Sequence, residues 1–140
     1  MKVLILTIAF SLAFSARGLA RIGDDEKQIE SVYGKVAKVL AENGNDRQVG
    51  YTAGAFAVIV NFVNGISRRE GFAKPDASAL KPEEIQQILS VSAANGTTWK
   101  ETAGSAGDRK WDRSDNKAVA VFPARGTFLF VQDPVYVQPD

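Results

Sequence analysis

The sequence predicts an α+β domain in which two helices pack on one face of an antiparallel, hairpin-rich sheet of five to seven strands. Two segments, 24–41 and one that starts at Pro82, carry apolar residues at helical spacing. Most of the remaining chain alternates as strands do, and pairs such as Asn64-Gly65 and Asp115-Asn116 suit tight turns. Because tight turns join antiparallel neighbours, these strands are expected to form a single sheet.

The first twenty residues have the pattern of a secretory signal peptide. Lys2 provides a positive start, and an apolar or small-residue run follows from 3 to 14. Small residues then occur at suitable cleavage spacing: Gly18 and Ala20, or alternatively Ala13 and Ser15. The run is too short to cross a ~30 Å hydrocarbon core, and it lacks the polar face of a mature surface helix. We therefore expect cleavage before Arg21, with 21–140 forming one exported domain that has no stable membrane insertion.

Composition indicates the compartment and excludes some partners. The chain has no cysteine, so it has neither disulfides nor a lipidation site, which favours a bacterial periplasm or exterior over a eukaryotic secretory route. Loss of Lys2 and Arg17 with residues 1–20 leaves 15 basic against 16 acidic side chains, a net charge of −1. This balance gives no electrostatic basis for binding nucleic acid. We find no internal sequence repeat and no second domain.

The segment 24–41 is predicted to form the first helix. Its apolar stripe consists of Ile29, Val32, Tyr33, Val36, Val39 and Leu40. Asp25 and Gln28 resemble a capping box at its start, and Gly44 is expected to end it in the left-handed conformation. Gly34 in mid-helix would cost about 1 kcal/mol relative to alanine, which suggests a close contact there.

The segment 51–72 is predicted to be a central hairpin. Its first strand is apolar on both faces, through Phe56, Val58, Val60 and Phe62 on one side and Ala57, Ile59 and Val63 on the other. Asn64-Gly65 makes the turn, and the returning strand carries Glu70. Pro82 then suits the first position of the second helix, although Lys81 lacks the side-chain oxygen of a usual cap.

Four short strands are predicted in the C-terminal part: "TTWKET", "RKWDRS", "KAVAVF" and "TFLFVQ". Asp115-Asn116 forms the turn between the second and third of these. Trp111 and Arg113 are two residues apart on one strand, so they should share a sheet face and make a cation–π contact.

Missing residue types limit the chemistry. Without histidine there is no Ser-His-Asp triad, and without cysteine there is no thiol nucleophile or zinc–thiolate site. No glycine-rich phosphate loop is present. We therefore assign no catalytic residue, no metal site and no cofactor.

Two functions remain open. The first is an exported, non-enzymatic binding or envelope-accessory domain with an envelope protein or glycan as its partner. Its candidate binding residues are Trp99, Trp111, Arg113 and Glu70. Exposed tryptophans provide platforms for sugars or proteins, whereas tryptophans in a domain of this size are more often part of the core.

The second function is a small carboxylate-based hydrolase of envelope or extracellular polysaccharide. It would require two acids about 5–9 Å apart in one cleft, with Glu70, Asp112 and Asp115 as the candidates. Asp115, however, lies in the predicted turn, where aspartate favours local hydrogen bonds. Asp112 alternates with Trp111 along a strand, so its side chain should point to solvent. Glu70 follows Arg69 and could pair with an arginine across the sheet.

The pattern also resembles small exported bacterial proteins that have no assigned function. The resemblance extends over 29–131 and rests on "YGK", the "NG" turn, "LKPEEIQQIL" and "WDRSDNKAVA". It departs from that pattern at Lys81 and Asn116. It implies a secreted α+β domain and carries over no site residues. The predicted layout is also similar, in fold alone, to periplasmic outer-membrane assembly factors and secreted β-lactamase inhibitor proteins.

Overall fold

The computed structural model describes residues 22–93 and 96–137. Its first half contains α1 (Glu26–Tyr33), β1 (Lys38–Asn43), β2 (Asp46–Ala53), β3 (Phe56–Val63) and β4 (Ile66–Ala73). Its second half contains α2 (Pro82–Val91), β5 (Trp99–Ala103), β6 (Arg109–Arg113), β7 (Val119–Phe122) and β8 (Leu129–Gln132). The predicted signal peptide, residues 1–20, lies outside the described residues.

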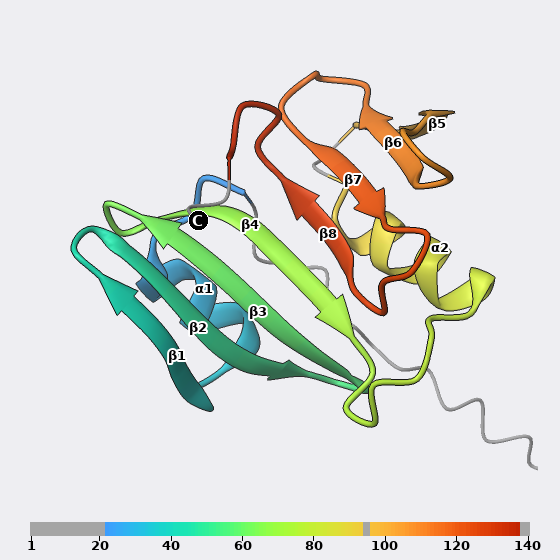
Figure 1. Cartoon of the computed structure of the whole chain (residues 1–140). Coiled ribbons are helices and arrows are strands. Elements are labelled where there is room, and N and C mark those ends of the chain that lie inside the picture. The colour runs from blue at the N-terminus through green and yellow to red at the C-terminus, as the bar shows by residue number, and fades with distance from the viewer. Residues whose placement is uncertain (1–21, 94–95, 138–140) are drawn as a thin grey trace, which may run out of the picture.

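The fold is α+β and mostly sheet, but the predicted number of strands is wrong. All eight strands belong to one antiparallel sheet in the order β1-β2-β3-β4-β8-β7-β6-β5 (Figure 1). The six predicted strands are present, and β1 and β2 are the two additional ones. In the described part of the chain no helix is long and apolar enough to span a membrane.

The first helix is shorter than predicted because Gly34 ends it. Gly34 has a φ of +86° and donates its N–H to the carbonyl of Glu30 at 2.8 Å. No atom lies within 4 Å of the position that a Cβ would take there, so the glycine is required by its conformation and no close contact explains it. The apolar residues Val39 and Leu40 belong to β1, and Gly44 (φ +61°) lies in the β1–β2 turn.

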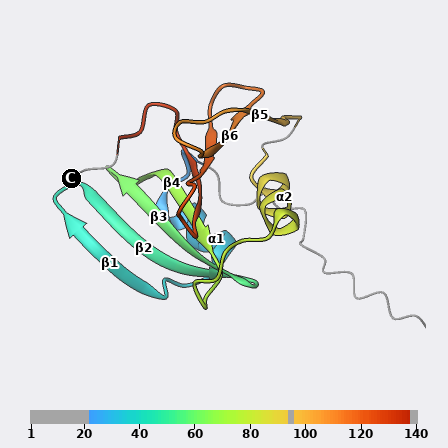
Figure 2. The same ribbon diagram turned by 45° about the vertical axis from the view of Figure 1, so that its right-hand side comes forward.

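The order of elements repeats, although the sequence shows no repeat. Each half is a helix followed by four antiparallel strands, and the halves join where β4 pairs with β8. At this junction Glu70 lies opposite Val131, and Gly71 lies opposite Phe130. The turned view in Figure 2 shows each helix beside the strands of its own half.

Both helices contribute to one hydrophobic core on a single face of the sheet. The helices supply Ile29 from α1 and Ile85, Ile88 and Leu89 from α2. The strands supply alternate side chains, among them Val49, Val58, Val60, Phe62, Phe72, Trp111, Ala120, Leu129 and Val131. The intervening strand residues point to the opposite face, which no helix covers among the described residues (Figure 1).

Candidate functional site

The four residues predicted to bind a partner all lie on the helix-covered face. Glu70, Trp111 and Arg113 are 1%, 3% and 6% exposed, and Trp99 is half-buried. Trp111 is therefore a core residue, the alternative that the composition of a small domain favours. In the folded domain these side chains do not form an open surface.

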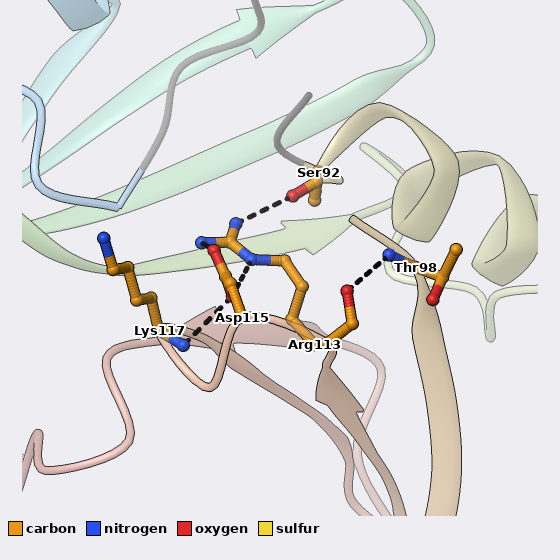
Figure 3. A network of polar contacts seen from close by, with 6 residues as sticks. Ser92, Thr98, Arg113, Asp115 and Lys117 are labelled. Atoms are coloured by element: carbon orange, nitrogen blue, oxygen red, sulfur yellow. Dashed lines mark hydrogen bonds and ion pairs between the residues drawn. The ribbon is translucent and has the colours of Figure 1, made fainter. Parts of the chain in front are cut away.

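Arg113 anchors the turn after β6 to the end of α2. Its Nε and Nη2 donate to the two carboxylate oxygens of Asp115 at 2.8 and 3.0 Å. Its Nη1 donates to the carbonyl of Ser92, at the C-terminus of α2, at 3.3 Å (Figure 3). These hydrogen bonds from Arg113 hold the pKa of Asp115 below its usual range. Asp115 is thus a structural partner of the arginine.

The remaining contacts of "WDRSDN" are also structural. Asp115 Oδ1 accepts from the Lys117 N–H at 3.0 Å, and Asn116 adopts a φ of +58° while donating to the carbonyl of Arg113. The Ser114 hydroxyl accepts from the Thr98 N–H at 3.0 Å and so connects this turn to the start of β5 (Figure 3). The turn predicted at Asp115-Asn116 is present; the Asp115 carboxylate is used within it, and the Ser114 hydroxyl connects it to β5.

The cation–π contacts differ from the predicted one. Arg109 lies over the Trp111 ring, 4.8 Å from its centroid, whereas Arg113 lies 5.9 Å from the Trp99 ring. The predicted pairing of Trp111 with Arg113 is replaced because Trp99 on β5 lies directly opposite Arg113.

Glu70 is a carboxyl group inside the core. The Tyr33 hydroxyl of α1 donates to Glu70 Oε1 at 3.0 Å. Burial, partly offset by the Tyr33 hydrogen bond and assisted by the nearby charge of Asp24, raises the pKa of Glu70 to about 8. Burial also raises the pKa of Tyr33. This pair joins α1 to β4; the Glu70 carboxyl is closed to solvent, and Tyr33 is half-buried.

The three candidate acids do not converge on one site. Glu70 points to the helix-covered face, whereas Asp112 alternates with the buried Trp111 and Arg113 and points to the uncovered face. Asp112 Oδ1 lies 3.5 Å from the Lys110 ammonium, and Asp115 is bound by Arg113. This arrangement does not support a carboxylate pair. In the described residues no group of three or more acidic side chains is arranged to hold a metal ion.

A row of planar polar side chains crosses the uncovered face. Gln48 of β2 lies opposite Asn61 of β3, Asn61 opposite Arg69 of β4, and Arg69 opposite Gln132 of β8. Their chain neighbours on the other face are buried: Val49, Val60, Glu70 and Val131. Because side chains alternate along a strand, the side chains of the polar row point to the uncovered face. All four members are half-buried, and they lie on four consecutive strands.

An aromatic stack lies beside the polar row. The rings of Phe128 and Phe130 are stacked with centroids 5.7 Å apart and an interplanar angle of 11°. The Arg69 guanidinium lies 3.6 Å from the centre of the Phe130 ring. A Cβ on Gly71 would come within 3.0 and 3.1 Å of these two rings, so the glycine provides the space for the aromatic stack.

The sequence analysis missed this surface. Alternation along single strands shows which residues share a face, but the polar row also depends on β2 and on the pairing of β4 with β8. Tyr136, after β8, has a pKa that burial raises, that the nearby charge of Arg69 lowers in part, and that the charge of Asp46 raises. The segment after β8 therefore lies near both β2 and β4.

A separate hollow of about 540 Å³ lies at the β1–β2 and β3–β4 turns, beside the first turn of α1. Its charged residues include Glu26, Glu42 and Arg47. The Arg47 guanidinium bridges the two glutamates, at 3.1 Å from Glu26 and 2.6 Å from Glu42. One arginine faces two glutamates here, and Asp46 also lines the hollow, so its lining has a net negative charge. The Arg47–Glu26 ion pair helps to hold α1 to β2.

Comparison with protein-family models, with curated protein sequences and with solved structures finds no match to this chain. The resemblance to small exported bacterial proteins therefore stays a prediction.

Proposed function

We propose that this protein is an exported, non-enzymatic binding domain of the bacterial envelope or exterior, and that its partner lies on the uncovered face of the sheet. The observation that carries the proposal is the polar row with the aromatic stack beside it. The proposed binding surface is therefore the uncovered face, and not the helix-covered face on which Trp99 and Trp111 lie. Export rests on the pattern of residues 1–20.

The chemistry of this face suits recognition. Arginine and aromatic side chains contribute strongly to binding energy at interfaces. Each amide of Gln48, Asn61 and Gln132 offers both donors and an acceptor. Because strands on both sides hold every member of the polar row in a fixed register, a ligand would meet groups that are already positioned, which lowers the entropic cost of binding.

The experiment compares two double variants that both alter exposed or half-buried residues of the uncovered face. Asn61→Ala with Phe130→Ala removes the centre of the surface, and Lys100→Ala with Thr102→Ala alters β5 at its far edge. Tagged full-length proteins, exported in a bacterial host, are used to capture envelope proteins and glycans, and their thermal melting is recorded as a folding control.

The central variant should lose specific capture while the β5 variant captures as the parent does. Equal capture by the parent and by a folded central variant would contradict the proposal.

A further inference from the structure

We infer that residues 133–137, which follow β8, form a strap that shields Arg69 on the uncovered face and that a partner must displace in order to bind there. This inference rests on the proposed function and adds a regulatory element to the same surface. A partner gains access to this arginine only in the fraction of molecules in which the strap is released.

A bulge in β4 turns two neighbouring arginines to the uncovered face. The register between β3 and β4 shifts after Arg69, and Arg68 is the extra residue. Ser67 and Glu70, on either side of the two arginines, are buried on the helix-covered face. Because a bulge lets two consecutive side chains share a face, Arg68 and Arg69 both point to the uncovered face. The first fastens the strap, and the second belongs to the polar row.

Asp133 fastens the strap to Arg68. Its N–H donates to the Arg68 carbonyl at 2.9 Å, and its Oδ2 accepts from Arg68 Nη1 at 2.8 Å. Within the strap, Asp133 Oδ1 accepts from the Val135 N–H at 3.0 Å, and its carbonyl accepts from the Tyr136 N–H at 3.0 Å. With Pro134 at the second position, these contacts form a tight turn that directs the chain back toward β4 after β8 (Figure 1).

Tyr136 is the side chain of the strap that turns toward the sheet. It is half-buried, whereas the valines on either side of it are 83% and 84% exposed. Burial raises its pKa, and the charges of Arg69 on β4 and Asp46 on β2 also act on it. Asp46 precedes Arg47, which points to α1, so Asp46 shares the uncovered face with Arg69. The ring therefore lies on the uncovered face, near β3, which separates β2 from β4.

The strap limits access to Arg69. The guanidinium lies 3.6 Å from the centre of the Phe130 ring, which covers one of its faces. Burial lowers the pKa of Arg69, as expected for a guanidinium that is partly removed from water. Since Tyr136 lies on the same face of the sheet, a partner that binds through this arginine needs the strap to move.

The strap is fastened weakly enough to open. In its ion pair the side chains of Arg68 and Asp133 are 43% and 18% exposed, and partly exposed pairs contribute little to stability. Residues 133–137 belong to no strand of the sheet. Segments with few buried apolar contacts open locally before a fold unfolds. Release of the strap therefore needs no change in the eight-stranded sheet.

The test measures how fast phenylglyoxal, a dicarbonyl that reacts with accessible guanidinium groups, modifies each arginine of the full-length protein. Tandem mass spectrometry assigns the modified residues, and the exposed Arg125 is the internal reference. Tyr136→Ala should raise the rate at Arg69 at least about threefold, because reactivity follows the open fraction. Val135→Ala, a change in an exposed neighbour, should leave the rates at Arg69 and Arg125 unchanged.

A second variant and a capture experiment separate this inference from the proposed function. Asp133→Ala removes the fastening and should also raise the rate at Arg69. Both strap variants should capture more of the envelope protein or glycan than the parent does, and Val135→Ala should capture the same amount. Thermal melting verifies folding in each case.

An unchanged rate at Arg69 in folded Tyr136→Ala and Asp133→Ala variants would overturn the inference and leave the proposed function standing. A raised rate with capture that is unchanged or reduced would also overturn it, because the partner would not compete with the strap. If a folded variant with Asn61→Ala and Phe130→Ala captures every partner that the parent does, the proposed function fails and the inference fails with it.

Discussion

The two halves of the molecule share one topology but fasten their helices by different means. α1 has eight residues, with Ile29 as its buried residue and a hydrogen bond from Tyr33 to the buried Glu70. α2 has ten residues, buries Ile85, Ile88 and Leu89, and is held at its C-terminus by Arg113. α1 is therefore held through the buried Glu70 and the partly exposed Arg47–Glu26 ion pair, whereas α2 is held by wider apolar burial and by the buried Arg113.

This difference predicts that pH has opposite effects on the attachments of the two helices. A raised pKa at Glu70 makes the first half less stable as pH rises. A lowered pKa at Asp115 makes the second half less stable in acid. The junction of β4 and β8 also brings three strands of the first half and one of the second into the polar row.

The largest effect is expected in the second half, from Trp111→Ala. The indole is 3% exposed, so its removal should cost about 3–5 kcal/mol through lost burial and a cavity. Denaturant unfolding would measure this loss. A change below about 1 kcal/mol would show that Trp111 does not support the core.

Glu70→Gln tests the buried pair of the first half. Glu70 has a folded pKa of about 8 against an ordinary value of 4.5, so its protonated form favours folding. Its full stabilising effect is present below pH 4.5, and it declines as pH rises toward 8. The glutamine keeps an acceptor for Tyr33 and does not ionise.

Relative to the parent, Glu70→Gln should therefore become more stabilising between pH 4.5 and 8, by a few kcal/mol at most. Urea unfolding across this range would measure the difference. A difference that is independent of pH would mean that Glu70 ionises normally.

Arg113→Met tests the bridge of the second half. It leaves Asp115 and the Ser92 carbonyl without their arginine hydrogen bonds, and should cost about 1.5–3 kcal/mol at neutral pH. The Arg113–Asp115 contribution is present above the ordinary pKa of aspartate and is lost as pH falls through the lowered folded value. The penalty should accordingly shrink in acid. A penalty as large in acid as at neutral pH would assign the loss to packing.

Asn116→Gly should have the smallest effect. Asn116 has a φ of +58°, which glycine adopts without strain, so the turn should be unchanged or stabilised by less than about 1 kcal/mol. Thermal melting would detect a clear loss, which would imply that the Asn116 side chain has a role in the turn.

Local patterns predicted much of this fold and little of the candidate surface. The α2 helix, six strands and the Asp115-Asn116 turn follow from periodicity and turn chemistry. The segment 38–43 was misassigned because Val39 and Leu40 also fit the helical stripe that starts at Ile29, and Gly34 interrupts that stripe. The β4–β8 pairing joins residues far apart in sequence, such as Arg69 and Gln132, so no local pattern could predict the polar row.

The most direct test of the proposed binding surface is amide chemical-shift mapping of the folded protein with the envelope protein or glycan that it captures. The shifts should concentrate at Gln48, Asn61, Arg69 and Gln132, with the indole signals of Trp99 and Trp111 unmoved. Shifts concentrated at the two indoles and along α2, with the polar row unchanged, would contradict the proposal and return the binding site to the helix-covered face.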